Sequence, residues 1–151
     1  MFWKRDKKPS PATPEAAAAS HPEEVHALAK AALAASGLAY ESATKEERHV
    51  VAVYFFGMAS AHGMTHKLPP EQTRALAQGA YQSAFNLKLA AAARAVEDGV
   101  KATKPGPHQK MTPVLHAGID GQAHFVAGNT AAIQASLAAL LDKVRAPRPP
   151  G

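Results

Sequence analysis

The amino-acid sequence predicts an all-α protein, a single compact domain of about six helices around one central hydrophobic helix. Alanine, the strongest helix former, dominates the apolar residues, while aromatic residues make up only 6% of the chain. Residues 50–59 form an apolar run without a charged or strongly polar side chain, and apolar residues elsewhere recur at three- and four-residue spacing. The 151 residues are enough for one domain with a buried core.

The central helix is predicted over residues 44–63. Its valines also favour a strand, but the ends of the segment decide for a helix. Thr44 and Glu47 have the spacing of a capping box, in which each side chain accepts a hydrogen bond from a backbone N–H of the first turn. Gly63 is predicted to end the helix, because glycine adopts the left-handed conformation without a steric cost. A helix that is apolar on all sides in its middle is a buried one.

The first helix is predicted to begin at Ser20, which has capping-box spacing to Glu23. Pro22 then falls in the first turn, where its missing N–H costs nothing, and Gly37 ends the helix. Residues 1–19 are basic and rich in proline and alanine, and we predict a disordered tail there. The folded domain is therefore expected to span residues 20–144.

The third helix is predicted to start at Pro70, and the fourth to be capped by Asn86. A proline- and glycine-rich break at residues 104–107 precedes the fifth, which is expected from about residue 111 to residue 126.

The pair Asp120-Gly121 is a turn signal, so the sequence leaves open whether the fifth helix is broken there. Asn129 is predicted to cap the sixth helix. Residues 145–151, rich in proline, are predicted to form a second disordered tail.

The formal charge of +5 does not indicate a nucleic-acid-binding protein. Residues 1–8 carry a net +3 and residues 142–151 a net +2, so the body of the chain is neutral. A domain that binds phosphate backbones normally concentrates its basic residues on one face of the fold. The ten-residue apolar run is about half of what a bilayer span requires, so no membrane span is expected. The absence of cysteine excludes disulfides, a thiol nucleophile and thiolate metal ligands, and fits a reducing compartment.

Histidines supply the candidate chemistry. His116, Asp120 and His124 follow one another at four-residue spacing, as do His62 and His66. On a continuous helix such residues share a face and could bind Zn²⁺ or iron. We nevertheless expect no essential metal and no cofactor, because Gly63 is predicted to end one helix before His66 and the turn signal at Gly121 leaves the continuity of the other helix open. A metal site at His116, Asp120 and His124 is the second interpretation.

The sequence does not indicate an enzyme. It contains no cysteine, no Gly-x-Ser-x-Gly motif and no glycine-rich phosphate loop, and its carboxylates lie largely in first turns, where capping explains them. A binding module remains, with residues 116–121 as its most distinctive segment. A generic helical adaptor, in which these glycines only permit close helix packing, is the plainer alternative.

Three segments resemble an all-α family of immunity proteins from bacterial polymorphic toxin systems. They are Phe56-Gly57-Met58, the segment HKLPPE at 66–71 and the segment LHAGIDG at 115–121. The chain departs from the family pattern at two positions. Pro69 stands before Pro70, and Ala117 occupies a position where the family pattern has a basic residue. The resemblance implies a cytoplasmic bacterial protein that binds and neutralises one cognate toxin domain, without catalysis and without a cofactor.

Within this resemblance we assign two sets of residues. Gly57, Pro70, Gly118 and Gly121 are interpreted as structural, and a neighbouring helix is expected to cross close to the backbone of Gly57. Four polar residues are predicted to contact the partner: His62, His66, His116 and Asp120.

Overall fold

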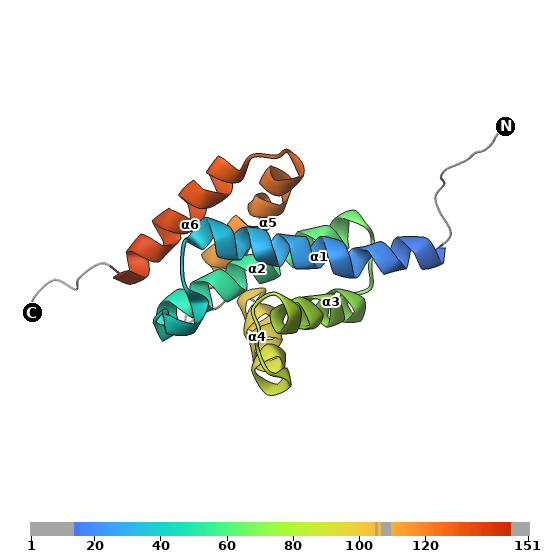
Figure 1. Cartoon of the computed structure of the whole chain (residues 1–151), viewed down its shortest axis with the longest axis horizontal. Coiled ribbons are helices and arrows are strands. Elements are labelled where there is room, and N and C mark those ends of the chain that lie inside the picture. The colour runs from blue at the N-terminus through green and yellow to red at the C-terminus, as the bar shows by residue number, and fades with distance from the viewer. Residues whose placement is uncertain (1–13, 105, 107–109, 146–151) are drawn as a thin grey trace, which may run out of the picture.

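The computed structural model describes residues 14–104, 106 and 110–145, and within these ranges the chain is helical without a strand. Six α-helices and a short 3-10 helix follow one another in the order shown in Figure 1. Their bounds are α1 Pro14–Ser36, η1 Tyr40–Ser42, α2 Lys45–Thr65, α3 Pro70–Ser83, α4 Leu89–Ala102, α5 Thr112–Val126 and α6 Thr130–Arg145. The predicted all-α class is confirmed. Residues 1–13 and 146–151, which belong to the predicted tails, lie outside the described residues.

Helix α2 is the centre of the domain, as predicted. It packs against each of the other five α-helices, and every residue from Val50 to Ala59 is buried. In Figure 1, α1 crosses in front of α2, while α4 points away from α2 on the side opposite α6. The capping box that starts α2 is present: the Thr44 hydroxyl accepts from the Glu47 N–H at 3.1 Å, and the Glu47 carboxylate accepts from the Thr44 N–H at 2.9 Å.

Glycines allow α5 to cross α2 backbone against backbone. A Cβ placed on Gly57 would overlap the carbonyl oxygen of Leu115 and lie 3.0 Å from the Cα of Gly118. A Cβ on Gly118 would in turn overlap the carbonyl oxygen of Tyr54. The predicted close crossing at Gly57 is therefore confirmed. Helix α5 is also continuous through residues 120 and 121, because its glycine face is held against α2 and this packing outweighs the local turn signal.

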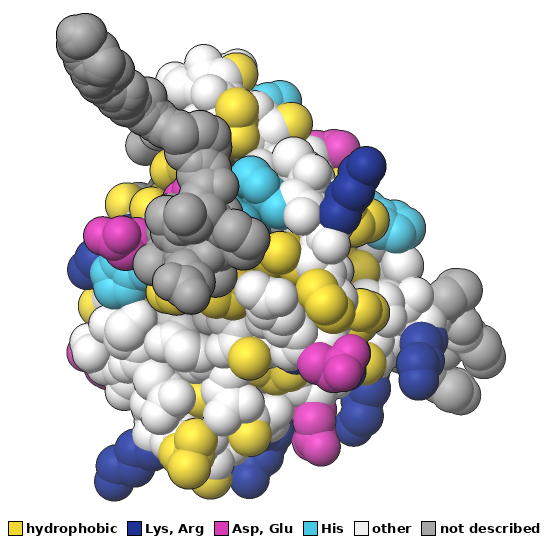
Figure 2. Space-filling view, turned by 90° about the vertical axis from the view of Figure 1, so that its right-hand side faces the viewer, with side chains coloured by type: hydrophobic (Ala, Val, Ile, Leu, Met, Phe, Trp, Pro, Cys, Tyr) yellow, Lys and Arg dark blue, Asp and Glu magenta, His cyan; other side chains and the backbone are white. Residues whose placement is uncertain are grey.

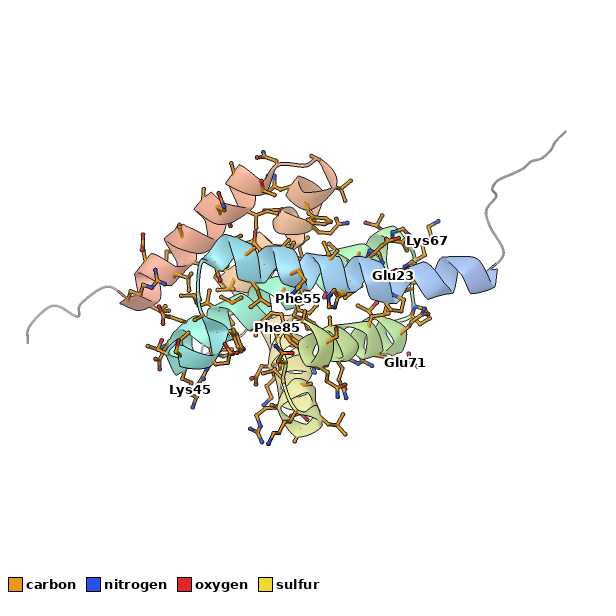
Figure 3. The ribbon with its side chains drawn as sticks, viewed as in Figure 1. Glu23, Lys45, Phe55, Lys67, Glu71 and Phe85 are labelled. Atoms are coloured by element: carbon orange, nitrogen blue, oxygen red, sulfur yellow. The ribbon has the colours of Figure 1, made fainter. Side chains whose placement is uncertain are left out.

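A buried aromatic cluster joins α2 to α3. Phe55, Tyr81 and Phe85 lie with ring centroids 5.1–5.6 Å apart, and Figure 3 places Phe55 and Phe85 near the middle of the molecule. The Tyr81 hydroxyl donates to the Ala52 carbonyl at 2.6 Å, and its complete burial raises the pKa of this phenol well above 10.0. The Tyr54 hydroxyl is buried without a hydrogen-bond partner, and burial raises the pKa of this phenol.

These two tyrosines give a matched pair of substitutions. Tyr81→Phe is expected to lower the free energy of unfolding by about 1–3 kcal/mol, because it leaves the buried Ala52 carbonyl without its side-chain donor. Tyr54→Phe is expected to leave stability unchanged or to raise it, because the lost hydroxyl is buried without a partner. Urea unfolding followed by circular dichroism measures both. A larger loss from Tyr54→Phe than from Tyr81→Phe would contradict this description of the core.

The start of α1 corrects the sequence prediction. The helix begins at Pro14, six residues before Ser20, so Ser20 and Glu23 lie inside it and do not form its first turn. Pro22 also lies inside the helix, where it removes one backbone hydrogen bond. The alanines of residues 16–19 favour continuation of the helix towards the N-terminus. The end at Gly37, with φ of 68°, is as predicted.

Two further predicted boundaries are wrong and two are right. Helix α2 continues past Gly63 to Thr65, and Asn86 does not cap α4, whose N-cap is Lys88. Asn86 instead adopts φ of 59°, a left-handed conformation that asparagine tolerates. Pro70 does start α3, and the Asn129 side chain accepts from the Ala132 N–H at 3.2 Å at the start of α6.

An ion pair joins the start of α2 to the end of α6: Arg145 Nε lies 2.6 Å from Glu47 Oε2. Hydrogen bonds from the Thr44 backbone and from Arg145 hold the pKa of Glu47 below its ordinary value of 4.5. The unfolded chain therefore takes up a proton at Glu47 at a higher pH than the folded chain does. The stabilisation from Glu47 is present above about pH 4.5 and is lost as the pH falls below it.

Glu47→Gln is accordingly expected to flatten the acid dependence of the melting temperature. The glutamine side chain can still accept the capping hydrogen bond, but it cannot titrate. The measurement is a series of thermal melts between pH 6 and pH 3, with Glu46→Gln as a control in the same helical turn. Equal slopes for the wild type and Glu47→Gln below about pH 4.5 would show that this group does not contribute.

Candidate functional site

A cluster of histidines lies where the end of α2 meets α1. His62 stands in the last full turn of α2 and His66 is its C-cap, while His21 and Glu24 stand three residues apart on α1. Figure 3 marks this end of the molecule by Glu23 and by Lys67, the neighbour of His66. Figure 2 views the molecule from this end, and histidine side chains are visible on that face among acidic and basic ones.

The three imidazoles are in mutual contact. His21 Nδ1 lies 2.8 Å from His62 Nε2, a hydrogen bond in which one ring donates and the other accepts. The centroid of the His66 ring lies 4.4 Å from that of His62 and 5.0 Å from that of His21. Glu24 Oε1 lies 3.7 Å from His62 Nδ1 and 3.9 Å from His66 Nε2. A single carboxylate therefore faces two of the three rings.

Burial divides the cluster into an inner and an outer part. His21 and His62 are 6% and 3% exposed, whereas the side chains of His66 and Glu24 are 41% and 50% exposed. Burial lowers the pKa of His62, and the neighbouring His66 and His21 lower it further, against the opposing effect of the Glu24 carboxylate. His62 is consequently a neutral imidazole at pH 7, with one ring nitrogen able to accept a hydrogen bond or bind a metal.

The four residues predicted to contact the partner do not form one site. His62 is too buried to be part of a contact surface. Asp120 adjoins Gly121, which lies against the Tyr54 hydroxyl, and Tyr54 lies twelve residues, about 18 Å along α2, from His66. His116 adjoins Leu115, whose carbonyl lies against Gly57, so it too is away from the end of α2. The structure therefore joins His62 and His66, and places His116 and Asp120 elsewhere on the molecule.

The prediction that Gly63 separates His62 from His66 is wrong. Gly63 lies inside α2 because α3 approaches it closely there: a Cβ at this position would overlap the Thr73 hydroxyl. The two histidines consequently share one face of a continuous helix. The sequence analysis also missed His21 and Glu24. Their three-residue spacing was a signal, but nothing local indicates that α1 brings them to the end of α2.

The second set of histidines does not converge. His116, Asp120 and His124 lie on a continuous α5, but the first and last are about 12 Å apart along the helix axis. Within the described ranges, ligand atoms of three or more histidine or acidic residues lie close enough for one metal ion only at His21, Glu24 and His62, where all are within 4.8 Å of one another. The second interpretation, a metal site at His116, Asp120 and His124, is therefore not supported.

A groove of about 730 Å³ lies at the other end of α2. Its apolar floor includes Phe85 and Leu87 of the α3–α4 connection, and α4 forms one wall. Across the groove His49 Nε2 lies 4.0 Å from Asp98 Oδ2. The charged and aromatic residues of its lining are Tyr40, Glu41, Lys45, Arg48, His49, Phe85, Arg94 and Asp98. An apolar depression with aromatic side chains is thus bordered by three basic residues, one histidine and two acidic residues.

Comparison with known proteins identifies the family. The model of the family described as Immunity protein 48 matches residues 23–145, which include all of α2 to α6 and most of α1. No curated protein and no solved structure matches the chain. None of the helices in the described part combines the length and the apolar character that a membrane span needs. The chain belongs to the Immunity protein 48 family.

Proposed function

We propose that this protein neutralises one cognate bacterial toxin domain in the cytoplasm by forming a stoichiometric complex with it. The family match over residues 23–145 is the observation that carries this proposal, because it spans nearly the whole helical domain. An inhibitor of this kind acts by covering a surface of its target. It requires an interface of about 800 Å² on its own side, in which a few residues supply most of the affinity.

The groove at the start of α2 is the surface that we propose for the toxin. Arginine and tyrosine are enriched among residues that dominate binding, and the groove presents Arg48, Arg94 and Tyr40 around an apolar floor. Lys45 also lines the groove and adds a third positive charge. Glu41 and Asp98 contribute two negative charges to the same lining. The complementary toxin surface would insert an apolar side chain between the helices and present carboxylates to the arginines.

The experiment is co-expression with the toxin-like reading frame next to this gene. Expression of that frame alone is expected to arrest growth, and co-expression of this protein is expected to relieve the arrest. The two proteins should then co-purify at a 1:1 ratio in size-exclusion chromatography with light scattering. A harmless neighbouring gene product, or relief of toxicity without a complex, would refute the proposal. If this protein relieves the growth arrest when it is present in much smaller amounts than the toxin, it acts by turnover and not by stoichiometric binding.

A further inference from the structure

We propose that His21, Glu24 and His62, together with His66, form a binding site for a divalent transition-metal ion, with zinc as the best fit. The inference is independent of the toxin partner, since it concerns the isolated domain. It rests on four side chains from two helices that converge at one end of the molecule. Nothing in the proposed neutralisation of a toxin requires them there.

The three candidate ligands lie close together, although His21 approaches His62 at Nε2 and Glu24 approaches it at Nδ1. One atom each from His21, Glu24 and His62 lies within 4.8 Å of the others. Tetrahedral zinc holds two imidazole nitrogens at about 2.0–2.1 Å from the metal, and so about 3.3 Å from each other. His21 Nδ1 and His62 Nε2 are 2.8 Å apart. To admit the ion, the proton that these nitrogens share must leave, the nitrogens must part by about half an ångström, and both rings must turn so that their lone pairs converge on the metal.

The fourth ligand is supplied by the helical spacing of α2. His66 follows His62 by four residues, so both rings project from one face at the end of the helix. His66 Nε2 is 3.9 Å from Glu24 Oε1, on the exposed side of the cluster. The group of ligand atoms within 4.8 Å of one another does not include His66, so this half-exposed ring would have to turn towards the ion to complete a shell of three nitrogens and one oxygen. Gly63, which was one reason to expect no metal, does not separate His62 from His66, because α2 continues past it to Thr65.

The donor set selects the class of ion. Imidazole and carboxylate suit Zn²⁺ and its neighbours in the first transition series, whereas Mg²⁺ and Ca²⁺ prefer shells made of oxygen. The inner pair, His21 and His62, is buried, which excludes water from that side of the ion. A bound ion would cross-link the first part of α1 to the end of α2. It would therefore stabilise this end of the domain by binding to the folded state alone.

The test uses the full chain produced without an affinity tag and treated with a chelator, which is then removed. Isothermal titration with ZnCl₂ is expected to give one equivalent of bound Zn²⁺, and saturating Zn²⁺ is expected to raise the melting temperature. Titration with Co²⁺ should give the intense visible absorption bands of a four-coordinate ion. MgCl₂ at the same concentration is expected to have no effect on the melting temperature.

The variants address the outer ligands, because substitution of the buried His21 or His62 could unfold the protein. Glu24→Gln and His66→Gln, made singly, are each expected to weaken Zn²⁺ binding by about tenfold or more. The control is the double variant His116→Gln/His124→Gln, which removes two imidazoles from α5 and should bind Zn²⁺ as the wild type does. Circular dichroism before the titration checks that every variant is folded.

Several outcomes would overturn the proposal. One is binding of less than one equivalent of Zn²⁺ by the wild type. Another is an affinity for Zn²⁺ in Glu24→Gln and His66→Gln equal to that of the wild type. A third is a loss of Zn²⁺ affinity in the α5 control as large as in those two variants. An octahedral Co²⁺ spectrum would refute the four-coordinate shell. None of these results depends on the toxin, so the metal site and the immunity function can fail separately.

Discussion

Gly57→Leu is expected to destabilise the protein by about 3 kcal/mol, the upper part of the range for overpacking in a core. The reason is that the new side chain would meet backbone and not another side chain. A Cβ at this position already overlaps the carbonyl oxygen of Leu115, and the Cα of Gly118 is 3.0 Å away. Since α2 and α5 cannot rearrange a backbone contact by rotating a side chain, the two helices must move apart. Urea unfolding followed by circular dichroism measures the effect.

Gly79→Ala is the matched control for this experiment. Gly79 lies in the middle of α3, it is exposed, and a Cβ there would meet nothing within 4 Å. The substitution is therefore expected to stabilise the protein by up to about 1 kcal/mol, because alanine is the better helix former. A melting temperature of Gly57→Leu at or above that of the wild type would show that α5 does not cross α2 at this glycine.

The parts of the fold that could be predicted from the sequence are those decided by local physics. The capping box of Thr44 and Glu47, the proline start at Pro70 and the cap at Asn129 each depend on residues within one turn, and each is present. The central position of α2 was also predictable, because a helix that is apolar on all sides has no face for water.

The features that could not be predicted depend on contacts between distant segments. A glycine in a helix is a stop signal by itself, but Gly63 faces Thr73 and Gly121 faces Tyr54, and these contacts keep both helices continuous. The histidine cluster has the same origin. His21 and His62 are 41 residues apart, and only the packing of α1 on α2 brings their rings together. No spacing rule within one helix can show such a pair.

Reversal of charge in the groove is expected to have the largest effect on function. The double variant Arg48→Glu/Arg94→Glu should weaken the complex with the toxin domain by at least about 2 kcal/mol, or roughly 30-fold in Kd. Both arginines line the groove beside Tyr40 and Phe85, so the variant places carboxylates where we propose that toxin carboxylates bind. Isothermal titration gives the Kd, and the growth assay should show that toxicity returns.

The control keeps the change in net charge and moves it to other surfaces. Lys30→Glu/Lys143→Glu reverses two exposed basic residues, one on α1 and one on α6, outside the groove. A general electrostatic attraction between the two proteins would weaken equally in both double variants, mainly through slower association. A specific contact in the groove weakens only in the first, and mainly through faster dissociation. Equal affinities for the wild type and Arg48→Glu/Arg94→Glu, with both proteins folded, would move the toxin-binding surface away from the groove.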